Sequence, residues 1–139
     1  MELIRIIAGE YYDVNLGRFQ SWVFSNSGDN GGISVISRQC MVETTGNVCG
    51  HIRRYYSDLG GGCPVFWQFS AGDLPSDCEL EQEDSPTGDR CHYNIKHLSN
   101  NKAGRLFKRL APDLRGIYVC IDGDERLVQV EDLSRDALL

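Results

Sequence analysis

Apolar and polar residues recur with a clear helical period in TTGNVCGHIRRYYSDLGGG, residues 44–62. The apolar positions share one narrow arc of a helix: Val48, Ile52, Tyr55, Tyr56 and Leu59. Asn47 is a good N-cap, and the glycine triplet that follows favours the left-handed conformation that ends a helix. We therefore predict an amphipathic helix over residues 48–59, with Arg53 and Arg54 on its polar face.

Short runs rich in β-branched and aromatic residues predict strands on both sides of this helix. They cover residues 3–8, 11–16, 19–25, 32–42, 64–69, 116–121 and 126–130, with 91–99 open between strand and loop. Turn residues favour two hairpins, one over residues 19–42 and one around Asp122-Gly123. A second amphipathic helix is predicted at 102–110. The order predicts an α+β fold, in which two main helices pack on one antiparallel or mixed sheet of about five to six strands.

The chain has the size and composition of a single domain spanning residues 1–139, with 41% apolar residues. Residues 71–90 are rich in acids and prolines, and we interpret them as a mobile acidic loop. We find neither an apolar run long enough to span a membrane nor an N-terminal secretory signal, so we expect a soluble, cytoplasmic protein. Edge strands near residues 3–16 or 126–130 could pair across a homodimer.

The net charge is −6, which argues against general affinity for nucleic acid or anionic membranes. Positive charge is nevertheless concentrated in residues 96–115, where six basic residues face one acid. On the second predicted helix, Lys102, Arg105 and Arg109 form a stripe beside the apolar face. Such a stripe is either an ordinary solvated face, or is neutralised by the acidic loop, or binds anions.

The anion-binding alternative defines our preferred function. The basic stripe, together with Arg53 and Arg54 if the two helices lie side by side, could clamp phosphate or carboxylate groups. Tyr56 offers an aromatic surface for stacking on a ligand. The prediction is a small binding protein that recognises a partner protein or a phosphorylated or anionic small ligand.

Six cysteines form an even set: Cys40, Cys49, Cys63, Cys78, Cys91 and Cys120. In a secreted chain this number suggests three disulfides, but without a signal peptide and with an adequate core we expect free thiols. Cys49 lies near the start of the predicted helix, where the positive end of the helix dipole favours a thiolate. It is therefore either a nucleophile or a small buried core residue.

The run NVCGHIRRYY resembles the nucleophile helix of papain-like peptidases and amidases, in which a cysteine near a helix start is followed by a histidine and then an aspartate or asparagine. The resemblance implies Cys49 as nucleophile, with His92 and Asp122 matching the order of the other two residues. It implies a cysteine hydrolase as the alternative function. Cys49 and His51 point in different directions on the helix, so that pair is not the expected dyad.

A structural zinc module is the second alternative. Its donors would come from the middle of the chain: Cys63, Cys78, Cys91, His92 and His97. No C-x-x-C pair is present, and the spacings exceed those of zinc ribbons. Phosphate-loop, dinucleotide-binding and G-x-S-x-G motifs are also missing. We therefore assign no metal and no cofactor from the sequence.

Overall fold

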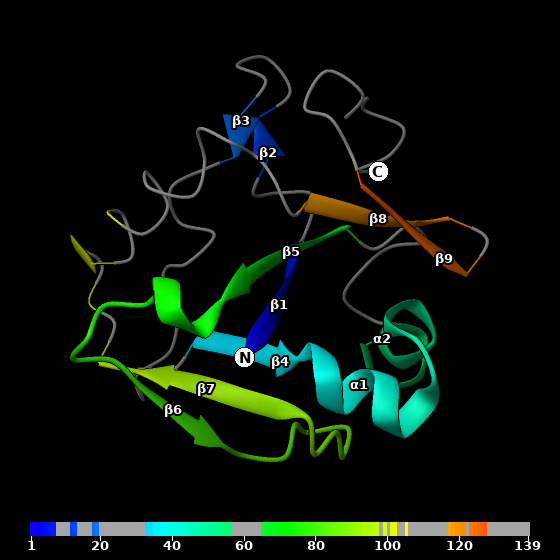
Figure 1. Cartoon of the computed structure of the whole chain (residues 1–139), viewed down its shortest axis with the longest axis horizontal. Coiled ribbons are helices and arrows are strands. Elements are labelled where there is room, and N and C mark those ends of the chain that lie inside the picture. Colours follow the sequence, from blue (N-terminus) through cyan, green and yellow to red (C-terminus); the bar gives the residue numbers. More distant parts are fainter. Residues whose placement is uncertain are drawn as a thin grey trace.

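The computed structural model describes residues 1–7, 12–13, 18–19, 33–56, 65–97, 99, 101–102, 105, 117–121 and 123–127. Within these residues a seven-stranded antiparallel sheet has the order β6-β7-β4-β1-β5-β8-β9 (Figure 1). Its strands are β1 Glu2–Ile7, β4 Ile33–Ser37, β5 Val65–Ser70, β6 Glu79–Gln82, β7 His92–Lys96, β8 Ile117–Ile121 and β9 Asp124–Leu127. The predicted α+β fold is confirmed, with slightly more strands than expected.

Two consecutive helices, α1 Arg38–Thr45 and α2 Val48–Tyr56, pack against the sheet. The prediction that residues 38–42 continue a strand is wrong. The Ser37 hydroxyl accepts from the Cys40 amide at 3.4 Å, so the strand ends at a helix N-cap. Gly46, with φ 91°, then ends α1 and allows the chain to turn into α2.

The second predicted helix can be followed only in part. Residues 101–102 and 105 are helical, and the rest of 102–110 lies outside the described residues.

The predicted hairpin over residues 19–42 is wrong in its pairing. β3 Arg18–Phe19 pairs with β2 Tyr12–Asp13, whereas β4 pairs with β1 and β7. The hairpin around Gly123 is confirmed as the antiparallel pair β8 and β9.

The core lies between the helices and one face of the sheet. Ile4, Ile36 and Phe66 of the sheet pack with Met41 of α1 and Ile52 of α2, and all five are buried. β1 lies between β4 and β5 at the centre of the sheet, so residues 2–7 are not an edge open to a second copy. β6 and β9 are the outer strands. No helix within the described residues is long and apolar enough to cross a membrane.

The acidic segment contains regular structure. Ser70 caps a 3₁₀ turn, Ala71–Asp73, through a capping box, and Glu79–Gln82 forms the edge strand β6. Glu79 and Glu81 are exposed while Leu80 is partly buried, which is the alternation expected of an edge strand. A high acid content therefore did not prevent strand pairing here, and the mobility of the segment stays a prediction.

Candidate functional site

Of the five cysteines within the described residues, four form disulfides. Cys40 of α1 is bonded to Cys91, which precedes β7, and Cys49 of α2 is bonded to Cys120 of β8. The expectation of free thiols is wrong for these four residues, while Cys78 is free. The pairs are 51 and 71 residues apart in sequence, and folding brings their Cα atoms to 5.4 and 5.7 Å. Sequence spacing alone gave no sign of this proximity.

The disulfides change the interpretation of Cys49. Its side chain is only 4% exposed, and a sulfur held in a disulfide is not a thiolate nucleophile. Nδ1 of His92 hydrogen-bonds the Glu83 carbonyl oxygen at 2.7 Å, and no hydrogen bond joins His92 to Cys49 within the described residues. Asp122 lies outside the described residues. The structure therefore does not bring Cys49 and His92 together as a catalytic pair.

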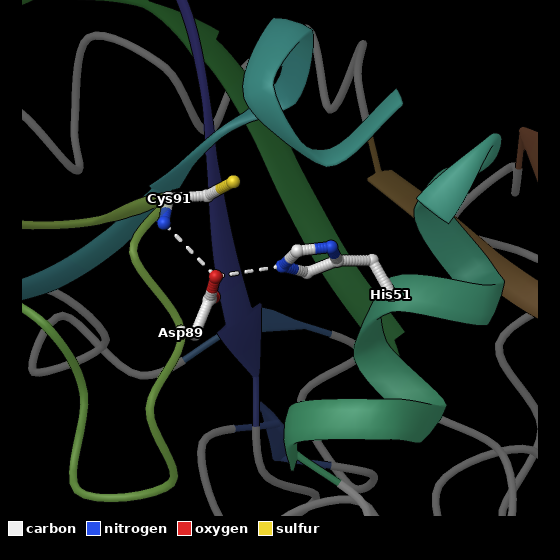
Figure 2. Close-up of side chains that lie close together, drawn as sticks. All are labelled: His51, Asp89 and Cys91. Carbon is white, nitrogen blue, oxygen red and sulfur yellow. Dashed lines mark hydrogen bonds and ion pairs between the residues drawn. The ribbon is translucent and has the colours of Figure 1, made fainter. Parts of the chain in front are cut away.

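A buried polar network centred on His51 and Asp89 joins α2 to the segment before β7 (Figure 2). His51 is fully buried, and its Nε2 lies 2.8 Å from Oδ1 of Asp89. The Tyr56 hydroxyl donates to the other carboxylate oxygen of Asp89. Both donors lie on α2, so a single carboxylate holds this helix against the chain segment that enters the sheet.

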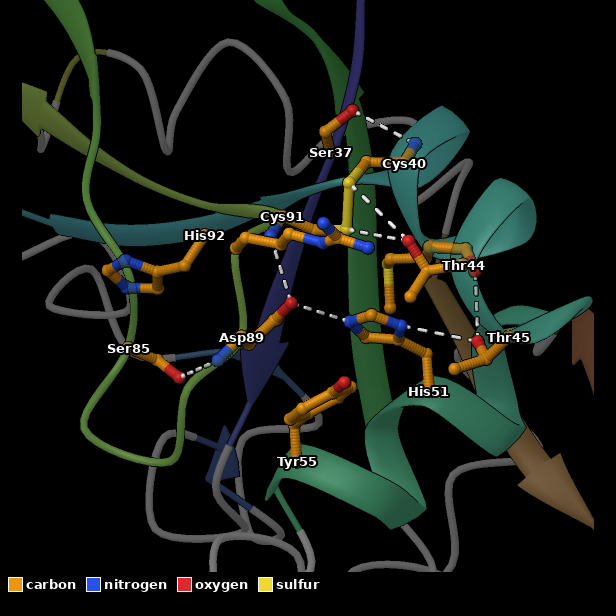
Figure 3. Close-up of polar contacts among 12 residues, drawn as sticks. Ser37, Cys40, Thr44, Thr45, His51, Tyr55, Ser85, Asp89, Cys91 and His92 are labelled. Atoms are coloured by element: carbon orange, nitrogen blue, oxygen red, sulfur yellow. Dashed lines mark hydrogen bonds and ion pairs between the residues drawn. A yellow bond between two sulfur atoms is a disulfide. The ribbon is translucent and has the colours of Figure 1, made fainter.

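Asp89 is positioned by a tight turn. The Ser85 amide donates to the Asp89 carbonyl, the Asp89 amide donates to the Ser85 hydroxyl, and the turn includes Gly88 at φ 88° (Figure 3). The Cys91 amide then donates to Oδ1 of Asp89 at 2.9 Å. The carboxylate thus accepts from three donors, which matches the acceptor-only character of its ionised form.

The other nitrogen of the imidazole faces a hydroxyl. Oγ1 of Thr45 lies 3.2 Å from Nδ1 of His51 and 2.9 Å from the Met41 carbonyl oxygen. When Nδ1 is unprotonated it can accept from Thr45; when it carries the proton, it donates to Thr45, whose hydroxyl then donates to Met41. The order hydroxyl, imidazole, carboxylate resembles a hydrolase triad, but this imidazole is fully buried and out of reach of a substrate.

The sequence pattern does not predict His51 as a site residue, because its only chemical neighbour on the helix, Cys49, points away from it. A signal was present: His51 lies three residues after Val48 and four before Tyr55, at the edge of the apolar arc of the helix. A histidine on a buried face needs polar partners, which here are Asp89 and Thr45. Neither partner could be chosen from spacing along the chain.

Tyr56 belongs to this network and does not offer an exposed surface. It is buried, and its hydroxyl donates to Asp89. Burial, and then the hydrogen bond to the Asp89 carboxylate, raise the pKa of Tyr56 far above its ordinary value. The phenol therefore stays protonated as a donor, and the expected stacking role of Tyr56 is not available in this structure.

The predicted basic residues divide into separate groups. Arg53 and Arg54 are exposed on α2, and the Arg54 guanidinium lies 5.2 Å from the centre of the half-buried Tyr55 ring. Lys102 pairs with Asp77 of the acidic segment, which is the internal neutralisation considered above. Arg105 is exposed, and Arg109 lies outside the described residues.

A cleft of about 400 Å³ lies where the α1–α2 junction meets β9. Its lining is Arg38, Val42, Gly46, Asn47, Val48, Cys49, Gly123, Asp124 and Glu125. Arg38 forms an ion pair with Glu125 and also donates to Gln68 at 2.6 Å. The charges in the wall of the cleft are thus partly satisfied within the chain.

The five donors expected for a zinc module do not converge among the described residues. The Cys78 sulfur is directed to the His97 carbonyl oxygen, His97 lies 3.8 Å from an oxygen of Glu79, and Cys63 is outside the described part. A different set does converge: the donor atoms of His51, Asp89 and Cys91 all lie within 4.8 Å of one another, and all three residues are buried.

Comparison of the chain with protein-family models, curated proteins and solved structures gave no significant match.

Proposed function

We propose that the chain is a disulfide-bonded binding protein that recognises an anionic group, phosphate or carboxylate, through the exposed face of α2. The residues that would make the contact are Arg53, Arg54 and Tyr55. This retains the predicted class of function and moves the expected aromatic contact from Tyr56 to its neighbour.

The observation that carries the proposal is the pair of adjacent arginines on a firmly anchored helix. Arg53 and Arg54 are exposed and have no acidic partner among the described residues, whereas Arg38 and Lys102 are both paired with acids. Guanidinium groups bind carboxylate and phosphate in bidentate geometry, so two together suit a multiply charged ligand. The position of Arg54 over Tyr55 limits its rotamers before any ligand arrives.

The anchoring of α2 supports the same proposal. Its buried side is held by the Cys49–Cys120 disulfide and by the hydrogen bonds of His51 and Tyr56 to Asp89. A helix held in this way presents its exposed side chains from a rigid base, which lowers the entropic cost of binding.

The test is a titration of the ¹⁵N-labelled protein with inorganic pyrophosphate and, separately, with a glutamate-rich peptide. We expect saturable chemical-shift changes at the amides of residues 53–55. Tighter binding of pyrophosphate would indicate phosphate recognition, and tighter binding of the peptide would indicate carboxylate recognition. R53Q/R54Q should weaken binding about tenfold or more, because each charge-assisted contact contributes about 1.5–3 kcal/mol.

R90Q/R126Q is the matched control, because it removes the same charge from two other exposed arginines. We expect this variant to keep its affinity within about twofold, since charges that do not touch the ligand act only through a screened field. An equal loss of affinity in both double variants would mean that binding depends only on the net charge of the protein. Shifts confined to other elements would reject the α2 face as the site.

A further inference from the structure

We propose that Cys40, Cys91, His51 and Asp89 form a redox-controlled site for zinc or a similar divalent metal ion. In the oxidised chain the two sulfurs form a disulfide beside the His51–Asp89 pair, and in the reduced chain the same four residues become metal ligands. This proposal is independent of anion binding by α2, because it uses the buried side of the helix.

The donor geometry is close to that of a metal site already. In a tetrahedral zinc site, Zn–N of about 2.0 Å and Zn–S of about 2.3 Å place the donors roughly 3.3–3.8 Å apart. Here the donor atoms of His51, Asp89 and Cys91 lie within 4.8 Å of one another, with 2.8 Å between His51 Nε2 and Asp89 Oδ1. Figure 2 shows the three side chains converging from α2 and the segment before β7. Small shifts of these side chains would therefore accommodate an ion.

Cys40 supplies the fourth ligand. Its sulfur is bonded to that of Cys91, so reduction leaves two thiols side by side at the end of the cluster. Cys₂His₂ is a common set of structural zinc ligands, and carboxylates also bind zinc at about 2.0–2.2 Å. The disulfide links α1 to the segment before β7, and a bound ion would link these two elements and α2 as well, through His51.

Outer contacts that orient the ligands are also in place. Thr45 Oγ1 lies 3.2 Å from Nδ1 of His51, the position from which a metal-bound imidazole donates its remaining N–H. Asp89 is oriented by the Cys91 amide and the Tyr56 hydroxyl. Thr44 Oγ1 lies 3.6 Å from the Cys91 sulfur and 3.9 Å from that of Cys40 (Figure 3).

The chemistry balances as a thiol–disulfide exchange followed by ligand exchange. A dithiol reductant gives two electrons and two protons to the Cys40–Cys91 bond, yields two thiols and itself becomes a disulfide. Metal binding releases the two thiol protons. The imidazole proton moves from Nε2 to Nδ1, and the resulting Nδ1–H donates a hydrogen bond to Thr45 Oγ1. Nε2 and an Asp89 oxygen then turn to the ion. In the reverse direction a small-molecule disulfide takes two electrons from the thiolates and two protons from water and becomes two thiols. The Cys40–Cys91 bond forms again, and the metal is released.

The second disulfide gives the proposal its specificity. Cys49 and Cys120 are buried and bonded to each other, yet the described residues place no comparable group of histidine and acid donors around them. Reduction of that pair would leave two thiols without nitrogen and oxygen ligands. Only the Cys40–Cys91 pair should therefore exchange a disulfide for a metal ion.

The test is an anaerobic titration of the full chain with Co²⁺, in a C63S/C78S background that leaves only the four cysteines of the two disulfides. After reduction by a phosphine, we expect one cobalt per chain, with a thiolate-to-cobalt charge-transfer band and the strong visible bands of a tetrahedral site. The oxidised protein should lack these bands, and oxidised glutathione should release the metal. Zinc should displace cobalt.

Matched variants decide which cysteines bind. C40A/C91A should lose the thiolate–cobalt band, while C49A/C120A, which also removes two thiols, should keep it. T45V should weaken cobalt binding about ten- to a hundredfold, because the hydroxyl that orients the His51 imidazole through Nδ1 is lost. If the reduced chain is unfolded without metal, cobalt should restore the dispersed amide spectrum of the folded protein.

Three results would overturn the proposal: no thiolate–cobalt band after reduction, the same band in C40A/C91A, or loss of the band only in C49A/C120A. Retention of full cobalt affinity by H51Q would also reject the site as drawn, because His51 is its only nitrogen ligand. None of these measurements depends on whether α2 binds anions, so failure of one proposal leaves the other intact.

Discussion

The two disulfides are alike as covalent bonds but differ in what surrounds them. Each ties a helix to the sheet region and closes a long loop, of 51 or 71 residues. Both bonds border the same apolar core. Cys40–Cys91 also lies beside a histidine, a carboxylate and two threonine hydroxyls, whereas the described residues place no such group of histidine and acid donors around Cys49–Cys120. Because the bond is the same in both pairs, the reactions that a cysteine pair can undergo depend on the residues around it.

Removal of either disulfide should have the largest effect on stability. In the chain-entropy model, loops of these lengths make both bonds worth about 4 kcal/mol. C40A/C91A and C49A/C120A should therefore lose similar amounts of unfolding free energy in denaturant titrations without metal. A difference well above about 1 kcal/mol would show that local packing, and not loop closure, dominates one of the bonds.

Asp89→Ala should have the next largest effect, a loss of about 3 kcal/mol of unfolding free energy. The substitution leaves three buried donors without their acceptor: His51, Tyr56 and the Cys91 amide. Urea titration measures the change. Glu81→Ala, which removes an exposed acid of the same segment, is the control and should stay within about 0.5 kcal/mol. Equal effects would mean that the network contributes little to holding α2.

Tyr56→Phe should cost about 1.5–3 kcal/mol at neutral pH, because a hydrogen bond to a charged carboxylate is lost. In the folded protein the pKa of Tyr56 is raised above the ordinary value of 10.0, so above that pH the unfolded chain releases this proton first. The contribution of Tyr56 to stability is therefore present below pH 10 and declines above it.

The measurement is the unfolding free energy of the wild-type protein and Tyr56→Phe from neutral pH to above pH 10. The gap between the two proteins should narrow at alkaline pH. Tyr93→Phe, which alters a partly exposed tyrosine, serves as control. A gap that is constant across this range would show that the native state does not hold the Tyr56 proton.

R53Q/R54Q should have the smallest effect on stability, within about 0.5 kcal/mol, because both side chains are exposed. Thermal unfolding checks this expectation. If R53Q/R54Q weakens anion binding but leaves stability nearly unchanged, the exposed side of α2 serves binding while its buried side serves stability. A loss above about 1 kcal/mol would mean instead that the arginines are structural, and the anion-binding proposal would lose its basis.

Local signals in the sequence were sufficient for much of the fold. The apolar period from Val48 to Tyr56 defined α2, and the aromatic run at residues 65–69 defined a central strand. The start of α1 was also readable, since Ser37 is a residue type that caps helices, but the β-branched run before it favoured a longer strand. These features depend on neighbours within a few residues, which one sequence contains in full.

The candidate sites depended on contacts that one sequence does not contain. His51 meets Asp89 across 38 residues, and the disulfides join residues 51 and 71 positions apart. The sequence by itself determined the α+β class, the amphipathic α2 and its exposed arginines. Only the tertiary structure decided that Cys49 is bonded, that Tyr56 is buried and that His51, Asp89 and Cys91 converge, because sheet pairing and helix packing set those distances.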